Sequence, residues 1–400
     1  MKAFARLLLL SLGLSACAGT QAPGSVSSSA SAAASPAPAA APTPPAAPRA
    51  RSPGGPLVYV AGYRAEILIF RLDVKTAQLT PVGQAEGGKD PSFLAFDPRG
   101  RFLFAVNEVD DGRVVSFAVD AASGALTRLN DASSAGFGPA HLSVDKTGRW
   151  VLVANYADPK PGTIAVLPIG ADGRLGAPVA RHDFGPATMP HFIATDPTNH
   201  FVFVPCKGGP YVAQHRFDVA TGMIPAGSPD RIASAPGAGP RHLAFHPNGR
   251  FAFVINEQAL TVTSYKFDAA SGQLTEIASM PTIPAEVTDR KGFSTAEIEV
   301  HPSGRWLYGS NRGHNSIVQF AIDQASGRLT LVGHEKHTIN KPRHFSLDPS
   351  GQVLMAANQD GASVSMFRID PGSGRLQVAG APVPAGNKPS FVGVLPTAVR

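Results

Sequence analysis

Residues 240–256 read Pro-Arg-His-Leu-Ala-Phe-His-Pro-Asn-Gly-Arg-Phe-Ala-Phe-Val-Ile-Asn, two apolar runs joined by a short polar turn. The turn, His246-Pro-Asn-Gly249, contains the residues that tolerate the special φ values of tight hairpin connections. Each apolar run has the length of a short β-strand. The segment therefore predicts a β-hairpin that begins at a proline and ends at an asparagine.

The same hairpin recurs along the chain, and its first and last positions always keep the same separation. Five further copies carry Asp-Pro-Arg-Gly or related residues in the turn, and they span Pro91–Asn107, Pro139–Asn155, Pro190–Cys206, Thr295–Asn311 and Pro342–Asn358. A seventh copy starts at Pro389, and successive copies begin 47 to 55 residues apart. A repeat of this length with several strands per copy indicates a β-propeller.

Two more strands follow each hairpin. The run 261–268 alternates apolar and polar residues, and 272–275 begins another short strand. The last hairpin is incomplete, because Pro389 supplies one strand and residues 57–86 supply three. We therefore predict an all-β fold over residues 56–396. It is a seven-bladed β-propeller with four antiparallel strands per blade, and its last blade is closed by the N- and C-terminal strands.

The N-terminal part of the chain has a different composition. Residues 1–16 combine Lys2 and Arg6 with an apolar run, and Leu14-Ser-Ala-Cys17 resembles a bacterial lipobox. We expect a lipoprotein signal peptide over 1–16 and lipidation of Cys17. Residues 17–55 are rich in Ala, Pro and Ser and predict a disordered tether. From these features we expect the protein in the cell envelope. A lipid alone would anchor it in the outer membrane, and the folded part would face the periplasm.

The two ends of each hairpin meet at one mouth of the propeller channel. Four chemically able residues from successive blades should converge there: His191, Arg241, Glu257 and Arg312. The arginines suit an anionic group or an oxyanion, and Glu257 or His191 suits proton transfer. Further candidates for substrate binding follow from the same geometry, and they are Tyr156, Lys207, His242, Glu297, Asn311 and His344.

Other interpretations of these residues stay open at this point. The charged residues at the mouth would also suit a salt-bridge network without chemistry. The asparagines that close the hairpins suit structural capping, and His246 and His301 sit in the turns at the far end. His141, His242, His344 and Glu297 share a column, but they come from four blades without the close spacing of metal ligands. We predict no metal and no cofactor.

Several motifs resemble the seven-bladed lactonase family, which includes propeller-type 6-phosphogluconolactonases and fungal carboxymuconate lactonising enzymes. They are the run from Gly239 to Arg250, Ile255-Asn-Glu257, the run from Glu297 to Ile317, and Lys341-Pro-Arg-His-Phe345. The resemblance covers about 57–395. In the muconate enzymes a His, two Arg and a Glu are implicated in the site. The resemblance places these at His191, Arg241, Arg312 and Glu257.

The chain departs from the family pattern in one blade. The family commonly reads Val-Pro-Asp-Leu-Gly followed by an Asp-Arg pair, whereas this chain reads Val204-Pro-Cys206-Lys207-Gly-Gly-Pro. An aspartate and an arginine are missing and a lysine has entered. The substrate preference is therefore expected to differ from that of the family.

The leading hypothesis is a metal-independent lactonase that hydrolyses a sugar lactone. Glu257 would be the general base, His191 an acid or second oxyanion contact, and Arg241 and Arg312 the anion holders. One alternative is a muconate-type lactonising enzyme, and another is a non-catalytic propeller that binds a ligand or an envelope partner. The formal net charge of +6 fits an anionic small molecule. Basic residues are dispersed, so we expect no nucleic-acid partner, and we expect a monomer.

Overall fold

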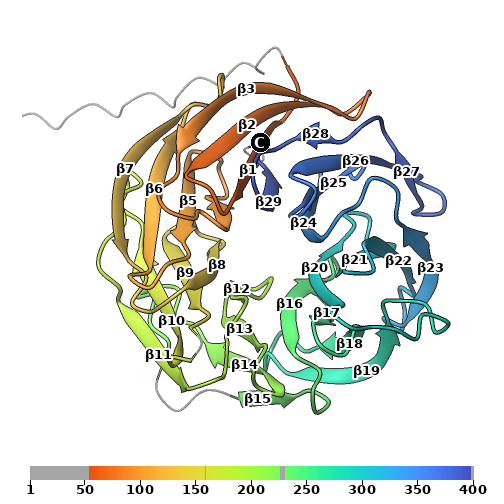
Figure 1. Cartoon of the computed structure of the whole chain (residues 1–400). Coiled ribbons are helices and arrows are strands. Elements are labelled where there is room, and N and C mark those ends of the chain that lie inside the picture. Colours follow the sequence, from red (N-terminus) through yellow and green to blue (C-terminus); the bar gives the residue numbers. More distant parts are fainter. Residues whose placement is uncertain (1–53, 158, 226–229, 398–400) are drawn as a thin grey trace, which may run out of the picture. The chain divides into compact units, whose positions relative to one another are not determined.

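Seven antiparallel sheets surround a common axis in the structure, a computed structural model that describes residues 54–157, 159–225 and 230–397 (Figure 1). Within these residues there is no helix, and hence none that is long and apolar enough to cross a membrane. The predicted signal peptide, Cys17 and nearly all of the predicted tether lie outside the described residues. Gly54 and Gly55 already accept hydrogen bonds from Arg71, at 3.5 and 3.2 Å.

We number the blades along the chain and give their strands from the channel outward. Blade 1 contains β29 (Pro389–Val394), β1 (Leu57–Gly62), β2 (Glu66–Asp73) and β3 (Gln78–Glu86). Blade 2 contains β4 (Leu94–Phe96), β5 (Phe102–Asn107), β6 (Arg113–Val119) and β7 (Leu126–Ser133). Blade 3 contains β8 (Pro139–Val144), β9 (Trp150–Asn155), β10 (Gly162–Pro168) and β11 (Ala180–Gly185).

The remaining blades follow the same order. Blade 4 contains β12 (Ala194–Thr195), β13 (Phe201–Cys206), β14 (Tyr211–Arg216) and β15 (Asp230–Ala233). Blade 5 contains β16 (Pro240–Phe245), β17 (Phe251–Asn256), β18 (Thr261–Phe267) and β19 (Leu274–Pro281). Blade 6 contains β20 (Ser294–Val300), β21 (Trp306–Arg312), β22 (Ser316–Ile322) and β23 (Leu329–Glu335). Blade 7 contains β24 (Pro342–Leu347), β25 (Val353–Asn358), β26 (Ser363–Ile369), β27 (Leu376–Val378) and the short β28 (Val383–Pro384).

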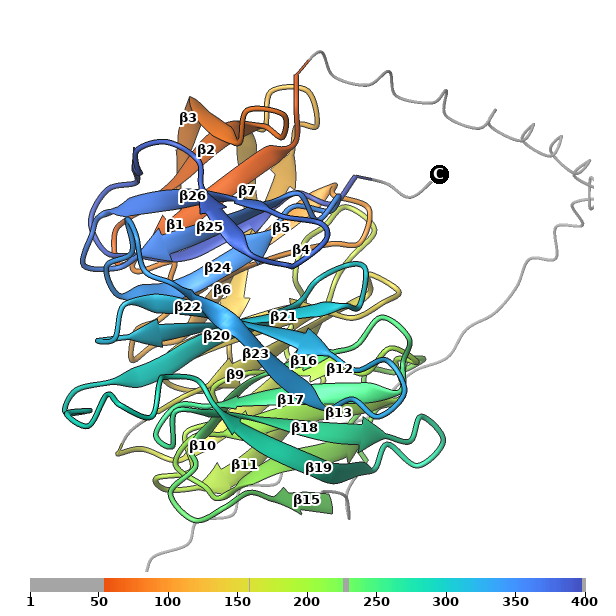
Figure 2. The ribbon, with the colours of Figure 1, turned by 90° about the vertical axis from the view of Figure 1, so that its right-hand side faces the viewer.

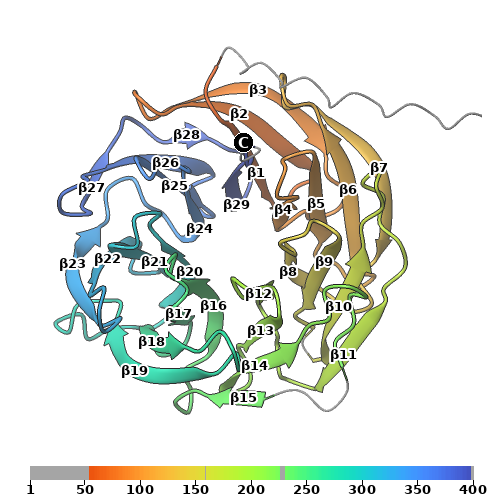
Figure 3. The ribbon, with the colours of Figure 1, turned by 180° about the vertical axis from the view of Figure 1, so that it is seen from behind.

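The ring closes through blade 1, as predicted. Strand β29 pairs antiparallel with β1, with Val394 opposite Val58 and Pro389 opposite Gly62. The two strands lie side by side in views from both ends of the ring (Figures 1 and 3). This pairing removes the open edges that the first and last strands would otherwise expose.

The hairpin register agrees with the constant separation in the sequence. The starting residue faces the closing residue in five copies: Pro139 and Asn155, Pro190 and Cys206, Pro240 and Asn256, Thr295 and Asn311, and Pro342 and Asn358. The residue after each closing position donates a backbone hydrogen bond to the chain just before the starting position. In blade 5 the Glu257 N–H donates to the Gly239 carbonyl at 2.7 Å. Each hairpin therefore ends at the same level of the ring.

A β-bulge follows the start of the inner strand, and the sequence did not predict it. In blade 5 the register shifts between Pro240 and His242, which leaves Arg241 as the extra residue. Blades 1, 3, 6 and 7 have a shift at the same level. A bulge changes the alternation of side chains locally, so that two consecutive residues can face one side. This is why both Arg241 and His242 line the channel mouth.

The core lies between neighbouring blades, whose sheets stack face to face in the side view (Figure 2). Strand β9 is buried along its whole length, like the corresponding strands of most blades. A recurring glycine lets the blades approach. Gly222 has φ +75° and a Cβ there would lie 2.6 Å from the Trp150 ring, and Gly374, with φ +70°, meets Trp306 in the same way. Only glycine satisfies both requirements.

The turns at the far end of the hairpins are structural, as expected. The Asp145 carboxylate accepts hydrogen bonds from the N–H groups of Arg149 and Trp150 at 2.8 and 2.9 Å. In blade 5 a histidine takes this place, and His246 Nε2 lies 2.8 Å from the carbonyl oxygen of Gly304 in the next blade. His301 makes the equivalent contact with blade 7.

Candidate active site

The four predicted site residues do converge at one mouth of the channel. Arg241 comes from the bulge of β16, and Glu257 follows β17 in the same blade. Arg312 ends β21 in the next blade. His191 lies at the start of the hairpin of blade 4, where its N–H donates to the Pro205 carbonyl at 3.0 Å. All four side chains are largely buried.

Glu257 is the centre of a cationic cluster. One carboxylate oxygen accepts a hydrogen bond from Arg241 Nη1. The other lies 3.1 Å from Arg312 Nη2 and 3.2 Å from Lys207 Nζ. Burial alone would raise the pKa of Glu257, but the charges of Arg241, Arg312 and Lys207 outweigh it and hold that pKa well below its usual value. Glu257 is therefore ionised at any physiological pH.

The cations in this cluster outnumber the carboxylate. Arg312 also donates to the Thr295 carbonyl at 2.8 Å, so its position is fixed from two sides. Burial and the nearby charge of Arg241 lower the pKa of Arg312 to about 9, and Glu257 opposes this shift only in part. Glu257 neutralises one of the three positive charges around it, so two remain and the mouth is strongly electropositive.

His191 lies beside this cluster as a neutral imidazole. Its ring centroid lies 5.4 Å from that of Tyr156 and 5.3 Å from that of His242. Among the described residues its ring nitrogens have no hydrogen-bond partner, and Nδ1 is buried. Burial, followed by the charge of Arg241, lowers the pKa of His191 well below its usual range. The ring is therefore uncharged at neutral pH.

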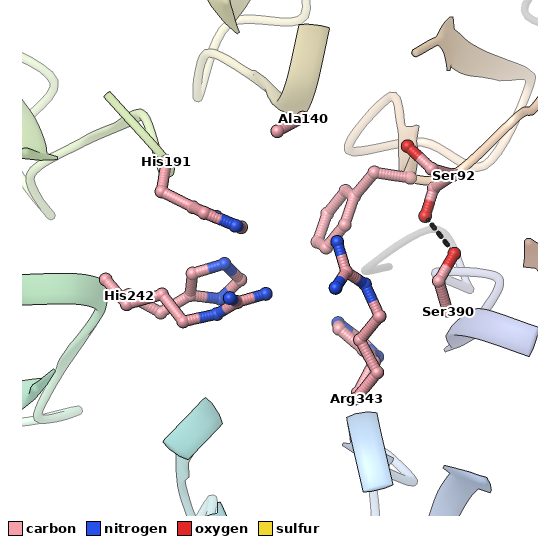
Figure 4. Close-up of a pocket in the computed structure, with 9 residues that line it drawn as sticks. Ser92, Ala140, His191, His242, Arg343 and Ser390 are labelled. Atoms are coloured by element: carbon pink, nitrogen blue, oxygen red, sulfur yellow. Dashed lines mark hydrogen bonds between the residues drawn. The ribbon is translucent and has the colours of Figure 1, made fainter. Parts of the chain in front are cut away.

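A small pocket lies between these side chains (Figure 4). Its walls are formed by Ser92, Phe93, Ala140, His191, Arg241, His242, Arg343, His344 and Ser390. In the close-up, His191 and Arg343 point toward the same central space from different blades. The cavity volume is about 10 Å³, which is close to what one water molecule requires. The pocket can thus hold one water beneath a ligand at the mouth.

A second layer of polar side chains supports the pocket from below. His242 Nδ1 lies 3.1 Å from Glu297 Oε1, and His344 Nε2 lies 3.1 Å from Glu297 Oε2. Glu297 thus connects the inner strands of blades 5 and 7 from its position on β20. Burial raises the pKa of Glu297, and His344 offsets this only in part. The layer positions His242 and His344 rather than contacting a ligand at the mouth directly.

The further predicted binding residues divide into three groups. Tyr156 and Lys207 lie at the mouth, where Lys207 Nζ donates to the Tyr156 hydroxyl at 2.9 Å. His242 and His344 line the pocket, and Glu297 lies beneath it, as described above. Asn311 is not among the residues that line the pocket. It is completely buried, and its amide donates to the Thr282 carbonyl and the Ser316 hydroxyl at 2.9 and 3.0 Å.

The predicted histidine column does not form a metal centre. In the described part of the chain, no three His, Cys, Asp or Glu side chains are placed to hold a metal ion. His141 belongs to that column, yet its ring packs 4.3 Å from the centroids of both Phe93 and Phe192. Its role is that of a buried aromatic contact.

The departure around Cys206 now has a physical explanation. Lys207 follows Cys206, which stands where the family commonly has an aspartate, and Lys207 supplies the third cation on Glu257. Cys206 is completely buried, and burial raises the pKa of its thiol to about 12. A thiol with such a pKa is a poor nucleophile, so Cys206 takes no part in the chemistry.

Three residues of the mouth were missed by the sequence reasoning as site residues. Arg343 lines the pocket, and Tyr63 and Ser390 complete the ring in blade 1. The hairpin of blade 1 is split between the chain ends, so its two mouth positions are far apart in the sequence. Ser390 is one residue beyond Pro389 and Tyr63 is one residue beyond Gly62, so the repeat rule applied to both ends of the chain would have identified these two.

Comparisons with known proteins agree with this geometry. A family model described as "Lactonase, 7-bladed beta-propeller" matches residues 57–393. The 6-phosphogluconolactonase of Bacillus subtilis is 30% identical over 299 residues, which cover 72% of this chain and 83% of that protein. The 6-phosphogluconolactonase of Pectobacterium carotovorum is 34% identical, over 73% of this chain and 84% of the relative.

Among solved structures, a periplasmic gluconolactonase from Pseudomonas aeruginosa superposes with a TM-score of 0.79. It shares 28% sequence identity, over 85% of this chain and 99% of that chain. This chain shares its closed seven-bladed ring with these propeller lactonases. The chain belongs to the lactonase family of seven-bladed β-propellers.

Proposed function

We propose that this protein is a metal-independent lactonase that hydrolyses a sugar lactone at the channel mouth, with His191 as the general base. The observation that carries the proposal is the one-water pocket in which a neutral, unpartnered imidazole faces a buried guanidinium. The relatives named above support the reaction class. The sugar lactone itself is inferred from their names.

The structure favours His191 over Glu257 as the base. Three cations surround Glu257, so its carboxylate holds a proton very weakly and has few free lone pairs. Its better-supported role is to fix the guanidinium groups of Arg241 and Arg312. Within the described residues His191, in contrast, forms no ion pair, and its uncharged ring has a nitrogen without a hydrogen-bond partner that can take a proton from water.

The proposed reaction proceeds in two steps. A ring nitrogen of His191 takes a proton from the pocket water, and the water oxygen forms a bond to the lactone carbonyl carbon. The carbonyl oxygen becomes an oxyanion, which the buried Arg241 guanidinium stabilises through N–H groups not used by Glu257. The tetrahedral carbon then expels the ring oxygen, which receives the proton from His191, and the product is a hydroxy acid.

A kinetic assay of the full-length protein on aldonolactones, corrected for spontaneous hydrolysis, tests this assignment. We expect His191→Asn to lower kcat by about 10²- to 10⁴-fold, the usual contribution of a general base. His200→Asn is the matched control, because His200 is an exposed histidine of the far-end turn in the same blade. Equal rates for wild type and His191→Asn would contradict the proposal, as would equal losses in both variants.

The chemistry described needs only protein side chains. We therefore expect turnover to survive exhaustive treatment with EDTA within experimental error. Loss of activity that returns on adding a divalent cation would contradict this part of the proposal.

We also propose that the protein is anchored to the membrane through a lipid on Cys17 and faces the periplasm. The support is the lipobox-like sequence before Cys17 and the apolar run that precedes it. The Cys17→Ser substitution should then move the protein from the membrane fraction to the soluble fraction, as measured by cell fractionation. Membrane retention of that variant would contradict the proposal.

A further inference from the structure

His242 lines the one-water pocket, yet the reaction proposed above uses only His191 and Arg241. The His242 side chain is almost completely buried, and Figure 4 shows it pointing toward the same central space as His191. The centroids of the two imidazole rings lie 5.3 Å apart. Among the described residues, Nε2 of His242 is buried without a hydrogen-bond partner. A water molecule in the pocket can therefore contact both imidazoles at once.

The surroundings of Glu297 determine which nitrogen of His242 carries the proton. Oε1 of Glu297 lies 3.1 Å from His242 Nδ1, and it also accepts a hydrogen bond from the Ile298 N–H at 3.0 Å. Burial lowers the pKa of His242 well below its usual range, so the ring is neutral and has one N–H donor and one acceptor nitrogen. Because Oε1 is an acceptor, Nδ1 is the donor and Nε2 has a free lone pair.

His344 faces the other oxygen of the same carboxyl group. Its Nδ1 accepts a hydrogen bond from the Val392 N–H at 3.4 Å, so the neutral ring carries its proton on Nε2, which lies 3.1 Å from Glu297 Oε2. Burial raises the pKa of Glu297, but Oε1 remains the acceptor with or without a proton on Oε2. The tautomer of His242 is therefore the same in both charge states of Glu297.

Building on the lactonase function proposed above, we propose that His242 is a second catalytic histidine, whose Nε2 holds the hydrolytic water by accepting one of its two hydrogens. His191 accepts the other hydrogen and takes that proton. With both hydrogens directed into the pocket, a lone pair of the water oxygen faces the mouth, where the carbonyl carbon of the lactone lies. Glu297 is a positioning residue, because it fixes the tautomer of His242 without touching the water.

The reaction balances with this arrangement. The water oxygen forms a bond to the carbonyl carbon, and the proton taken by His191 returns to the ring oxygen when the C–O bond of the lactone breaks. The hydrogen held by His242 stays on the water oxygen, which becomes part of the carboxylic acid group of the product. His242 therefore acts by orientation and needs no net change in its own protonation.

His141 shows a histidine of the same layer without such a contact. It occupies the position in blade 3 that His242 occupies in blade 5, and the two ring centroids lie 5.4 Å apart. Its Nδ1 accepts a hydrogen bond from the Ile193 N–H at 3.3 Å, and it is not among the residues that line the pocket. His141 is therefore the matched control for His242, with similar burial and no contact with the pocket water.

Replacing each of these rings by phenylalanine in the full-length protein tests the role of His242. His242→Phe keeps a ring of similar volume and removes Nε2, so we expect kcat on an aldonolactone to fall about 10- to 100-fold, the cost of a misplaced reacting group. KM should stay close to that of wild type, because the contact is made to the water and not to the lactone. His141→Phe should keep the kcat of wild type.

Glu297→Gln tests the positioning role while keeping the shape of the side chain. The amide brings N–H donors to a site where His242 and His344 both donate, so one of the rings loses its acceptor. We expect kcat to fall by a smaller factor than in His242→Phe, again with KM close to that of wild type. A rise in KM with kcat unchanged, in either variant, would show a contact with the lactone and would overturn the inference.

A spectroscopic measurement on wild type reads the tautomer directly and needs no turnover. In protein labelled with ¹⁵N-histidine, the nitrogen shifts of His242 distinguish a protonated from an unprotonated ring nitrogen. The ring is assigned through its contact with Phe192, whose ring centroid lies 5.3 Å away. We expect a protonated Nδ1 and an unprotonated Nε2 at pH 7, and a protonated Nε2 would overturn the inference.

The outcomes separate this inference from the proposed function. A folded His242→Phe enzyme that keeps the kcat of wild type overturns the role of His242, as does an equal loss in His141→Phe, and a loss in His191→Asn alone leaves the proposed function standing. If wild type hydrolyses no lactone, the proposed function fails and the catalytic role of His242 fails with it. The tautomer set by Glu297 is then still decided by the nitrogen shifts.

Discussion

The two sides of the channel mouth use arginine in opposite ways. On the side of blades 4 to 6, Arg241 and Arg312 contact the buried carboxylate of Glu257. On the side of blades 7, 1 and 2, Arg343 contacts a neutral phenol, and the carboxylate of Glu108 lies beyond that phenol. The first side is a fixed electrostatic structure, and on the second side Arg343 has no ion-pair partner among the described residues.

This difference shows that the residue type alone does not define a role. Three arginines occupy equivalent or neighbouring positions of the repeat, and only their partners distinguish them. Burial lowers the pKa of His191, which lies between the two sides, and the positive charge left over on both sides lowers that pKa further. The site is therefore best understood as one carboxylate and one imidazole in an excess of positive charge.

Removing the carboxylate of the fixed side should have the largest effect. Glu257→Gln leaves three cations close together without a counter-ion, and we expect a loss of about 3–5 kcal/mol in the free energy of unfolding. Because the pKa of Glu257 is lowered in the folded state, its contribution is complete above the unfolded value of 4.5. The difference between wild type and variant should thus be constant from pH 8 to pH 5, measured by denaturant unfolding.

A double variant checks the cause of that loss. Adding Lys207→Met to Glu257→Gln removes one of the unpaired cations and should recover part of the stability. If the double variant is less stable than Glu257→Gln alone, charge repulsion is not the reason for the loss.

A carboxylate deeper in the channel provides the opposite case. Glu299 on β20 accepts a hydrogen bond from the Leu347 N–H at 2.9 Å, on the strand that also carries Arg343, and no cation among the described residues pairs with it. Burial, followed by the charge of Glu297, raises the pKa of Glu299 to about 8. Its ionisation therefore opposes folding, in contrast to that of Glu257.

The sign of this effect is testable. Between pH 4.5 and about pH 8 the unfolded chain loses its proton from Glu299 before the folded protein does, so the wild type loses stability as the pH rises. Glu299→Gln should match wild type near pH 4 and exceed its stability by about 1–3 kcal/mol at pH 9. A variant that is less stable than wild type at pH 9 would contradict this description.

The smallest expected effect belongs to the most exposed cation of the fixed side. The Lys207 side chain is 19% exposed, and two arginines remain on Glu257 after its removal. Lys207→Met should lower the free energy of unfolding by at most about 1 kcal/mol. A loss as large as that of Glu257→Gln would show that Lys207, rather than the arginines, supports the carboxylate.

The sequence predicted the scaffold well because one physical rule governs it. A constant separation between Pro240 and Asn256, and between their counterparts, is enough to set the strand register of every hairpin. The split blade followed from the same rule, since Pro389 had no partner strand after it. Antiparallel pairing of β29 with β1 confirms this inference.

The details of the site depended on features that the pattern does not contain. The bulge beside Pro240 is a change of register, not of residue type, so the sequence named His242 as a candidate without explaining how it could face the same pocket as Arg241. Asn311 looked like a pocket residue because it neighbours Arg312, but strand alternation turns it toward the Thr282 connection. The contact of Arg343 with Tyr63 became visible only in the structure.

The pH dependence of kcat/KM tests the central claim most directly, namely that burial and the excess positive charge keep His191 unprotonated. With spontaneous hydrolysis subtracted, we predict a kcat/KM that is constant from pH 8 to below pH 6, because the pKa of His191 lies well below its ordinary value of 6.5. A rate that falls by half near pH 6.5 and continues to fall below it would show an unperturbed imidazole and would contradict the account.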